Sequence, residues 1–359
     1  MLRAREAVQN LPTYHPPLAG RTGLRLDFNE NTVGCSSRVL ERLRRIEAED
    51  LARYPERGPV EALVTGHLGV DPAELLLTNG VDEAIHLICD TYLGSGDEAL
   101  VVVPTFSMYQ IFAAATGARV IQIPAGEDFA FPVAAILNHI NSSTRLIALA
   151  NPNNPTGSVA SPDDILLIAK RAPQAAILVD EAYFEFYGNS VLRRWVERPN
   201  LFVARTFSKA YGLAGLRVGV LMGNVDQMSS VRRVASPYNV NSVALICLPD
   251  ALADEAYLLE YVKQVRAGRQ RLEQELASLG IRFWPSHANF VLMRLGEFNS
   301  AFVARMRERG ILVRDRSRDP GCDGCVRITL GSAEQTDRLL HVMRQTLTEI
   351  GATRQEARR

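Results

Sequence analysis

Residues 201–219 read LFVARTFSKAYGLAGLRVG, and this stretch decides the fold. It opens with an apolar run of strand character and leaves the strand through small and hydroxylated residues. Lys209 lies at that exit among apolar neighbours, where desolvation lowers the pKa of an amine and leaves it nucleophilic. Ser208 offers a hydroxyl and Arg217 a planar, charged fork, and both suit a phosphate. The pattern predicts a Schiff-base lysine at the rim of a sheet; the alternative is a surface lysine in a glycine-rich loop.

The thirteen residues from Arg205 to Arg217 resemble the lysine segment of the histidinol-phosphate aminotransferase family, which are pyridoxal-phosphate (PLP) enzymes of fold type I. The resemblance extends from Tyr14 to Gly331. It implies an α/β fold with a large domain, whose mostly parallel central sheet is flanked by helices, and a smaller α+β domain. The expected divisions are an N-terminal arm at residues 1–34 that contributes to the small domain and to dimer contacts, a large PLP-binding domain at 35–250 and a small C-terminal domain at 251–359.

Composition narrows the possible partners. Acidic and basic residues are equal in number, so the formal net charge is zero, which argues against a nucleic acid or an anionic membrane as the main partner. No apolar run is long enough to span a bilayer, and the N-terminus lacks a signal-peptide core. Five cysteines without dense spacing fit free thiols in a reducing cytoplasm. Cys322 and Cys325 form a lone C-x-x-C, so we expect no metal site.

Gly80, Asn154, Asp180 and Lys209 each follow a predicted strand directly. Alternating strands and helices indicate a largely parallel sheet, in which ligands bind beyond the carboxyl ends of the strands. We therefore expect these four residues to form one site. The strands concerned are predicted at residues 74–78, 146–150, 176–179 and 201–204, and the main helices at residues 36–48, 81–92, 162–172, 255–279 and 298–309.

A strand, a glycine turn and a helix N-terminus together present backbone N–H groups to an anion. The resemblance assigns such a turn, Gly80 to Asp82, to the PLP phosphate, with the backbone rather than the carboxylate of Asp82 facing it. It also implies that a tyrosine in an Arg-Tyr-Pro element reaches the cofactor of the partner subunit in a homodimer. The residues that the resemblance places around the phosphate are Gly80, Val81, Asp82, Thr206, Ser208, Arg217 and, from the partner, Tyr54.

Asp180 ends an apolar strand, where a carboxylate needs a cationic partner or hydrogen bonds. A protonated pyridine nitrogen supplies the cation, and this pairing makes the PLP ring an electron sink. The resemblance implies that Tyr183 and Asn154 hydrogen-bond the phenolic oxygen and that Phe106 stacks on the ring. A helix cap at Asp180 and a core position for Phe106 remain alternatives.

Arg327 and Arg314 carry the evidence on the substrate. Two guanidinium forks suit a dianionic phosphate better than a single carboxylate. The resemblance implies that both bind the substrate, together with Tyr14 and Asn29. Thr32 stands where the family usually has a proline. A surface role for Arg314 and a turn-forming role for Asn29 are the alternatives.

The resulting prediction is a transaminase of histidine biosynthesis, with Lys209, Asp180 and Tyr183 as its catalytic residues. L-Histidinol phosphate and 2-oxoglutarate would give imidazole acetol phosphate and L-glutamate. An aromatic or broad-specificity aminotransferase would share every cofactor residue. A PLP-dependent decarboxylase of the threonine-phosphate type would use a related scaffold. A non-catalytic PLP-binding regulator would need an added DNA-binding segment or a lost lysine.

Overall fold

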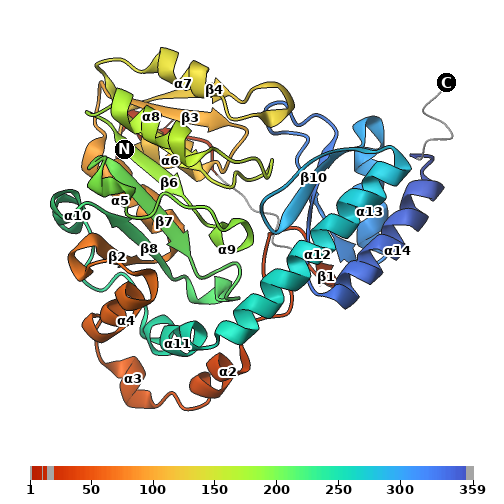
Figure 1. Cartoon of the computed structure of the whole chain (residues 1–359), viewed down its shortest axis with the longest axis horizontal. Helices are drawn as coiled ribbons and strands as arrows, with labels where there is room; N and C mark the ends of the chain where they lie inside the picture. Colours follow the sequence, from red (N-terminus) through yellow and green to blue (C-terminus); the bar gives the residue numbers. More distant parts are fainter. Residues whose placement is uncertain (1, 10, 14–19, 353–359) are drawn as a thin grey trace.

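A seven-stranded sheet organises the larger part of the chain (Figure 1), in a computed structural model that describes residues 2–9, 11–13 and 20–352. The strands lie across the sheet in the order β2 (Leu75–Thr78), β8 (Gly219–Gly223), β7 (Leu201–Thr206), β6 (Ala176–Asp180), β5 (Thr144–Ala150), β3 (Glu98–Val103) and β4 (Arg119–Pro124). Strand β8 runs antiparallel to both of its neighbours, so the other six strands point the same way and end at one edge. The expected mostly parallel central sheet is confirmed.

Both faces of this sheet are buried, because alternate residues of each apolar strand point to opposite sides. Leu75 and Leu77 belong to one hydrophobic cluster and Leu76 to the other. One face is covered by α5 (Gly80–Tyr92), α6 (Met108–Ala115) and α10 (Val225–Arg232). The other is covered by α2 (Ser37–Leu43), α4 (Gly58–Leu68), α7 (Val133–His139), α8 (Pro162–Arg171) and α11 (Ser242–Ala253).

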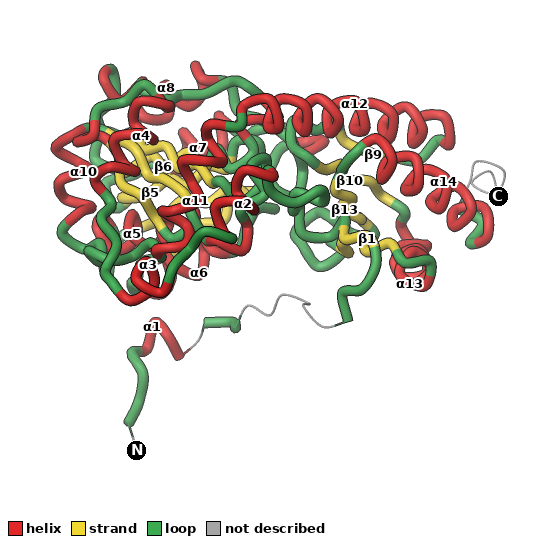
Figure 2. The backbone as a smooth tube through the Cα atoms, turned by 90° about the horizontal axis from the view of Figure 1, so that it is seen from below, coloured by secondary structure: helices red, strands yellow, loops and turns green. Residues whose placement is uncertain are grey.

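A four-stranded antiparallel sheet forms the C-terminal part. Its order is β12 (Arg314–Asp315), β13 (Cys325–Thr329), β10 (Phe290–Arg294) and β9 (Arg282–Trp284). It packs with α12 (Glu255–Leu279), α13 (Asn299–Glu308) and α14 (Ala333–Glu349). Helix α12 has the predicted bounds and runs from one sheet to the other (Figure 2). The domain boundaries at residues 34/35 and 250/251 stay predictions.

The N-terminal segment joins this C-terminal part. Strand β1 (Leu24–Arg25) pairs in parallel with β11 (Ile311–Leu312), nearly 300 residues later. The short helix α1 (Glu6–Gln9) precedes it and packs near α6. The helix predicted at residues 36–48 ends early, because Glu47 and Asp50 form a capping box that starts a separate helix, α3 (Ala48–Ala52).

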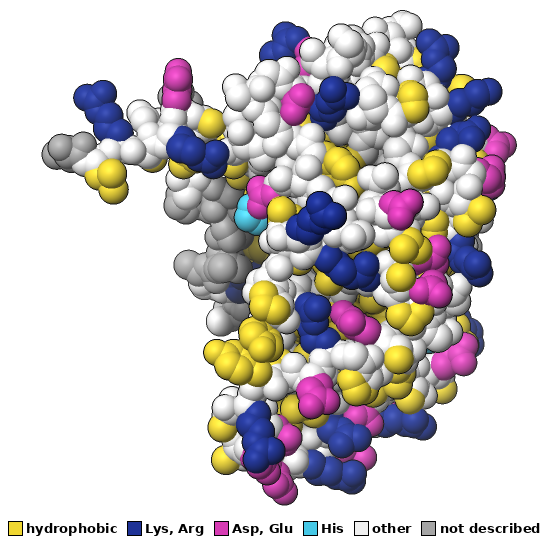
Figure 3. All heavy atoms as spheres, turned by 90° about the vertical axis from the view of Figure 1, so that its left-hand side faces the viewer, with side chains coloured by type: hydrophobic (Ala, Val, Ile, Leu, Met, Phe, Trp, Pro, Cys, Tyr) yellow, Lys and Arg dark blue, Asp and Glu magenta, His cyan; other side chains and the backbone are white. Residues whose placement is uncertain are grey.

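Acidic and basic side chains are interspersed on the face shown in Figure 3, as a net charge of zero allows. Across the residues that the structure describes, no helix combines the length and apolarity that crossing a bilayer requires.

Candidate active site

One cavity of about 310 Å³ lies at the carboxyl edge of the seven-stranded sheet. All of the predicted cofactor residues except Gly80 and Tyr54 line it. They are Val81, Asp82, Phe106, Asn154, Asp180, Tyr183, Thr206, Ser208, Lys209 and Arg217. The structure therefore brings together residues at the ends of five different strands, β2, β3, β5, β6 and β7, because parallel strands end on the same side.

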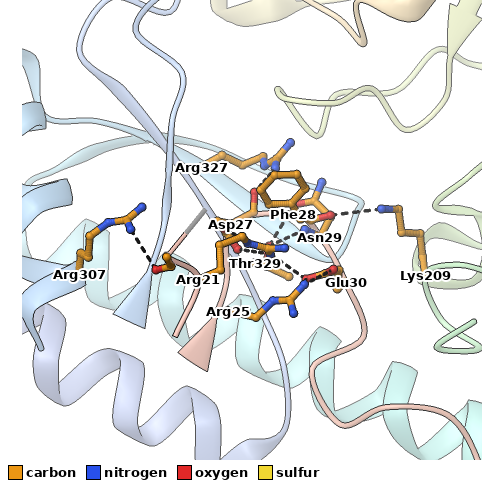
Figure 4. Close-up of polar contacts among 11 residues, drawn as sticks. Arg21, Arg25, Asp27, Phe28, Asn29, Glu30, Lys209, Arg307, Arg327 and Thr329 are labelled. Carbon is orange, nitrogen blue, oxygen red and sulfur yellow. Dashed lines mark hydrogen bonds and ion pairs between the residues drawn. The ribbon is translucent and has the colours of Figure 1, made fainter. Parts of the chain in front are cut away.

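Lys209 projects into this cavity just after β7. Its Nζ donates a hydrogen bond to the carbonyl oxygen of Phe28 at 3.3 Å (Figure 4). Burial lowers the pKa of the Lys209 amine to about 8, and the positive charge of Arg327 acts in the same direction. A substantial fraction of the amine is therefore neutral near physiological pH. The chain contains only two other lysines, Lys170 and Lys263, and both are exposed.

Asp180 ends β6 and lines the same cavity as the lysine. Its carboxylate accepts hydrogen bonds from the Tyr109 hydroxyl at 2.5 Å and from the Ala182 N–H at 2.9 Å. Within the described residues no basic side chain forms an ion pair with it, and burial raises the pKa of Asp180 to about 6. A buried carboxylate with two donors and no counter-cation suits a ligand that presents a cationic nitrogen, as protonated PLP does.

Tyr109 is a site residue that the sequence reasoning left without a role. It lies on α6, three residues after Phe106, and the two rings meet edge to face with centroids 6.0 Å apart. Both side chains line the cavity. The one available signal was its position three residues after Phe106, just beyond the same predicted strand.

The start of β8 sets the geometry of the predicted phosphate site. Gly219 pairs with Thr78 of β2 on one side and with Thr206 of β7 on the other. The glycine turn after β2 and the exit from β7 therefore flank the segment that carries Arg217. This pairing explains why residues more than a hundred positions apart meet at one point.

Arg217 closes this site against the N-terminus of α5. Its Nη2 donates to Asp82 Oδ2 at 3.0 Å. A Cβ atom at Gly80 would lie 2.7 Å from the same nitrogen, and Gly80 has a φ of 72°, so a side chain is excluded there. The helix N-terminus, the guanidinium and the Ser208 hydroxyl all supply donors at this end of the cavity, and such donors favour an anion.

Arg327 is buried beside the cavity rather than in its wall. Its Nη2 donates to the Asp27 carbonyl oxygen at 2.7 Å, and its Nη1 donates to the side-chain oxygen of Asn154, which does line the cavity. Burial lowers the pKa of Arg327 to about 9, and the nearby charge of Arg316 adds to this effect. A guanidinium whose pKa is this far below its ordinary value has no acidic partner among the described residues that balances its charge.

Arg314 lies directly opposite Arg327 in the β12–β13 ladder. Its guanidinium is 5.1 Å from the centroid of the Phe28 ring, and that ring lines the cavity. Arg314 Nη1 and Arg327 Nε are buried, and neither finds an acceptor among the described residues. Unpaired buried donors of this kind favour an anionic ligand.

Residues 21–30 approach the lysine, whose amine contacts the carbonyl oxygen of Phe28 (Figure 4). Asn29 has a φ of 55°, and its side chain donates to the Tyr183 hydroxyl at 2.9 Å and accepts from the Thr329 hydroxyl at 3.0 Å. Asn29 thus acts on the cavity through Tyr183, while Phe28 and Glu30, which the sequence reasoning did not select, line it directly.

Four charged side chains of this segment pair with one another, and we call them the N-terminal charge cluster: Arg21, Arg25, Asp27 and Glu30. It holds two positive and two negative charges. The cluster therefore neutralises itself and offers no counter-charge to the arginines of β12 and β13.

Tyr54 and the cysteine pair do not line the cavity. Tyr54 is exposed and stacks on Tyr238 with ring centroids 4.2 Å apart, and Tyr14 lies outside the described residues. Cys322 and Cys325 are free, buried thiols, and the described residues contain no group of three or more potential metal ligands.

The chain resembles known proteins over almost its whole length. Residues 21–343 match the family model described as aminotransferase class I and II. A histidinol-phosphate aminotransferase of Thermoanaerobacter sp. (strain X514) is 35% identical over 328 residues, which cover 90% of this chain and 93% of that protein.

Two solved structures are similar as well. The histidinol-phosphate aminotransferase of Sinorhizobium meliloti in complex with pyridoxal-5'-phosphate has a TM-score of 0.88 at 25% identity, covering 98% of this chain and 99% of that one. The L-threonine-O-3-phosphate decarboxylase of Porphyromonas gingivalis has a TM-score of 0.78 at 25% identity, covering 90% of this chain and 99% of that one.

Proposed function

Because this chain belongs to the aminotransferase class I and II family, and within it to the histidinol-phosphate aminotransferase family, we propose that it is a PLP-dependent aminotransferase acting on L-histidinol phosphate. The amine passes to 2-oxoglutarate, which gives imidazole acetol phosphate and L-glutamate, a step of histidine biosynthesis. The observation that carries the activity is that one cavity is lined both by Lys209, whose pKa is lowered to about 8, and by the buried carboxylate of Asp180.

The residues of the cavity fit the cofactor. When bound, PLP supplies a conjugated ring that accepts the electron pair of the bond broken at the amine-bearing carbon. Asp180 would hold the ring nitrogen protonated, Tyr183 and Asn154 would hydrogen-bond its phenolic oxygen, and Phe106 would stack on its face. The phosphate would lie in the site of Arg217, Ser208, Thr206 and the α5 N-terminus described above.

Lys209 would have two tasks. It would hold the cofactor covalently through Nζ, and after the incoming amine displaces it, Nζ would carry the proton that leaves the amine-bearing carbon of the substrate. A pKa of about 8 supports both tasks, because the amine is then readily deprotonated and readily reprotonated.

Arg314 and Arg327 support a phosphate substrate. They lie opposite each other and hold buried N–H groups without acceptors in the described structure. A phosphate ester presents three oxygens and up to two negative charges, which match two forks better than a carboxylate does. Asn29 would position Tyr183, and Tyr14 would complete the substrate site.

A homodimer completes this proposal. Tyr54 is exposed and does not line the cavity of its own chain, which supports a role for it at the cofactor phosphate of the partner subunit. We also propose the division into an N-terminal arm, a large domain and a small domain at residues 34/35 and 250/251, and a cytoplasmic location.

A substrate panel with purified holoenzyme tests the function. Glutamate should form from 2-oxoglutarate with L-histidinol phosphate as donor and at least a hundredfold less efficiently with phenylalanine or tyrosine, because only the phosphate ester satisfies both arginines. Comparable turnover of the aromatic amino acids would instead favour a broad-specificity aminotransferase. Carbon dioxide release from threonine phosphate would favour a decarboxylase, the second candidate, which the similarity to a solved decarboxylase of the same fold keeps open.

A further inference from the structure

Three arginines project from one face of the β12–β13 ladder. Arg314 lies opposite Arg327, and the Arg316 N–H donates to the Cys325 carbonyl oxygen at 2.9 Å, which continues the ladder by one more pair. Opposite residues of an antiparallel pair share a face, and so do residues two apart on one strand. The sequence analysis selected Arg314 and Arg327, whereas Arg316 received no role.

These three arginines carry more charge than their surroundings balance. The only ion pair that any of them makes with a described residue is that of Arg316 with Asp319. The N-terminal charge cluster beside them neutralises itself. Three positive charges and one negative charge leave an excess of two, which equals the charge of a fully ionised phosphate monoester.

Each of the three guanidinium groups also holds a buried donor without a partner. The atoms are Arg314 Nη1, Arg316 Nε and Arg327 Nε, and no acceptor for them exists in the described part of the chain. Burial is the largest cause of the lowered pKa of Arg327. The positive charges of Arg316 and Arg314 lower this pKa further, and Arg316 has the larger effect of the two. The ladder and this charge effect agree that Arg316 lies beside Arg314 and Arg327, the two proposed substrate arginines.

The loop that carries Arg316 is closely folded. The Asp319 N–H donates to the Arg316 carbonyl oxygen at 2.9 Å, the Cys322 N–H to that of Asp319 at 3.0 Å, and the Cys325 N–H to that of Cys322 at 2.9 Å. Three successive turns thus lead from β12 back to β13. They hold Asp319 where its carboxylate pairs with the Arg316 side chain, so the guanidinium is fixed before a ligand binds.

We propose that Arg316 is a third arm of the substrate phosphate site, with Asp319 as the residue that positions it. Arg314, Arg316 and Arg327 would then donate to the three free oxygens of one phosphate ester. This inference rests on the proposed function, because it adds a residue to the same substrate site. Asp319 cancels the charge that Arg316 adds, so the contribution of Arg316 would be further hydrogen bonds to the phosphate oxygens, beyond those of Arg314 and Arg327.

The test compares Arg316→Ala with Arg318→Ala, which removes an exposed arginine of the same loop. For Arg316→Ala we expect the KM for histidinol phosphate to rise roughly tenfold or more, with kcat within about threefold, because a charge-assisted hydrogen bond to a bound ligand is lost. Arg318→Ala should match the wild type. Arg316→Lys keeps the charge but not the fork, and it should fall between the two.

Calorimetric titration of the holoenzyme with inorganic phosphate gives a readout that needs no turnover. The affinity should weaken in Arg316→Ala by a factor similar to that for KM and stay unchanged in Arg318→Ala. If the wild type turns over no histidinol phosphate, the proposed function fails, and the phosphate titration alone decides on Arg316. A lower melting temperature for Arg316→Ala with unchanged phosphate affinity and KM would make Arg316 a loop tether and overturn the proposal.

Discussion

The two sides of the cavity are built differently. On the cofactor side, polar groups are paired with one another before any ligand binds, as Asp180 is with Tyr109 and Arg217 is with Asp82. On the substrate side, Arg314 and Arg327 hold buried donors for which the described structure has no acceptor. On the cofactor side the polar groups already have partners within the protein. On the proposed substrate side, the unpaired donors of the two arginines would gain acceptors from a bound anion.

Because of this difference, we expect substitutions on the two sides of the cavity to change different kinetic quantities. The cofactor side belongs to the rigid edge of the seven-stranded sheet, and changes there should lower turnover for every substrate. The substrate side belongs to β12, β13 and residues 21–30, and changes there should act mainly on the KM of the phosphate substrate. Each prediction below tests this separation, beginning with the largest effect.

Loss of Lys209 should have the largest effect. In Lys209→Ala we expect turnover to fall by roughly 10⁴-fold or more with every amino donor, because the covalent anchor and the proton carrier are the same atom. Steady-state glutamate formation measures this. The control Lys263→Ala removes an exposed lysine and should stay within about twofold of the wild type. A Lys209→Ala enzyme within tenfold of the wild type would contradict the assignment.

Asp180→Asn should come next, with kcat lowered by roughly 10²- to 10³-fold for all donors. Asparagine can keep the hydrogen bonds to Tyr109 and Ala182 but has no negative charge for the ring nitrogen. Single-turnover rates with glutamate and with histidinol phosphate should therefore fall by similar factors. A loss confined to histidinol phosphate would place Asp180 on the substrate side.

The same substitution has a separate consequence for stability in the cofactor-free protein. Burial raises the pKa of Asp180 from 3.8 to about 6, so the folded state binds this proton more tightly than the unfolded state does. The contribution of this group to the free energy of unfolding therefore falls as the pH rises from about 4 to about 6. Denaturation against pH should show Asp180→Asn equal to the wild type near pH 4 and at least as stable above pH 6. A variant that is less stable above pH 6 would contradict the burial argument.

Arg327→Lys tests the substrate side. Lysine keeps the charge but cannot form a planar fork, so the KM for histidinol phosphate should rise roughly 10- to 100-fold while the affinity for PLP stays unchanged. Cofactor titration and initial rates measure the two quantities. Arg294→Ala, an exposed arginine of β10, is the matched control. Weakened PLP binding in Arg327→Lys would break the separation of the two sides.

Tyr109→Phe should give the smallest effect, a loss of roughly 3- to 30-fold in kcat. The hydrogen bond from Tyr109 lowers the pKa of Asp180, so its removal should raise that pKa further. The acidic limb of kcat/KM against pH should then move to higher pH, which a merely structural role would not produce. If the acidic limb of the pH profile stays at the same pH, Tyr109 contributes only packing.

The sequence was enough to predict the positions of site residues that lie directly at the end of a strand. Asp180 and Lys209 are found at strand ends, and the parallel direction of the strands was enough to bring them together. It did not find β8, because Gly219 to Gly223 is a short run that continues a glycine-rich loop, and the antiparallel direction of this strand depends on sheet order rather than on local pattern.

The contacts of the substrate side lay beyond local pattern altogether. Asn29 meets Thr329 across 300 residues, and Arg327 reaches the carbonyl oxygen of Asp27 across the same separation. The pairing of Tyr109 with Asp180 likewise depends on the order β3, β5 and β6 in the sheet. No spacing along the chain encodes such contacts, because tertiary packing creates them.

Borohydride reduction of the holoenzyme followed by peptide mass mapping tests the central claim most directly. Reduction makes the bond between PLP and an amine permanent, and the chain has only three lysines to distinguish. The account predicts the added mass of the reduced cofactor on Lys209 and on neither Lys170 nor Lys263. The added mass on either of those two, or its absence from Lys209, would contradict the account.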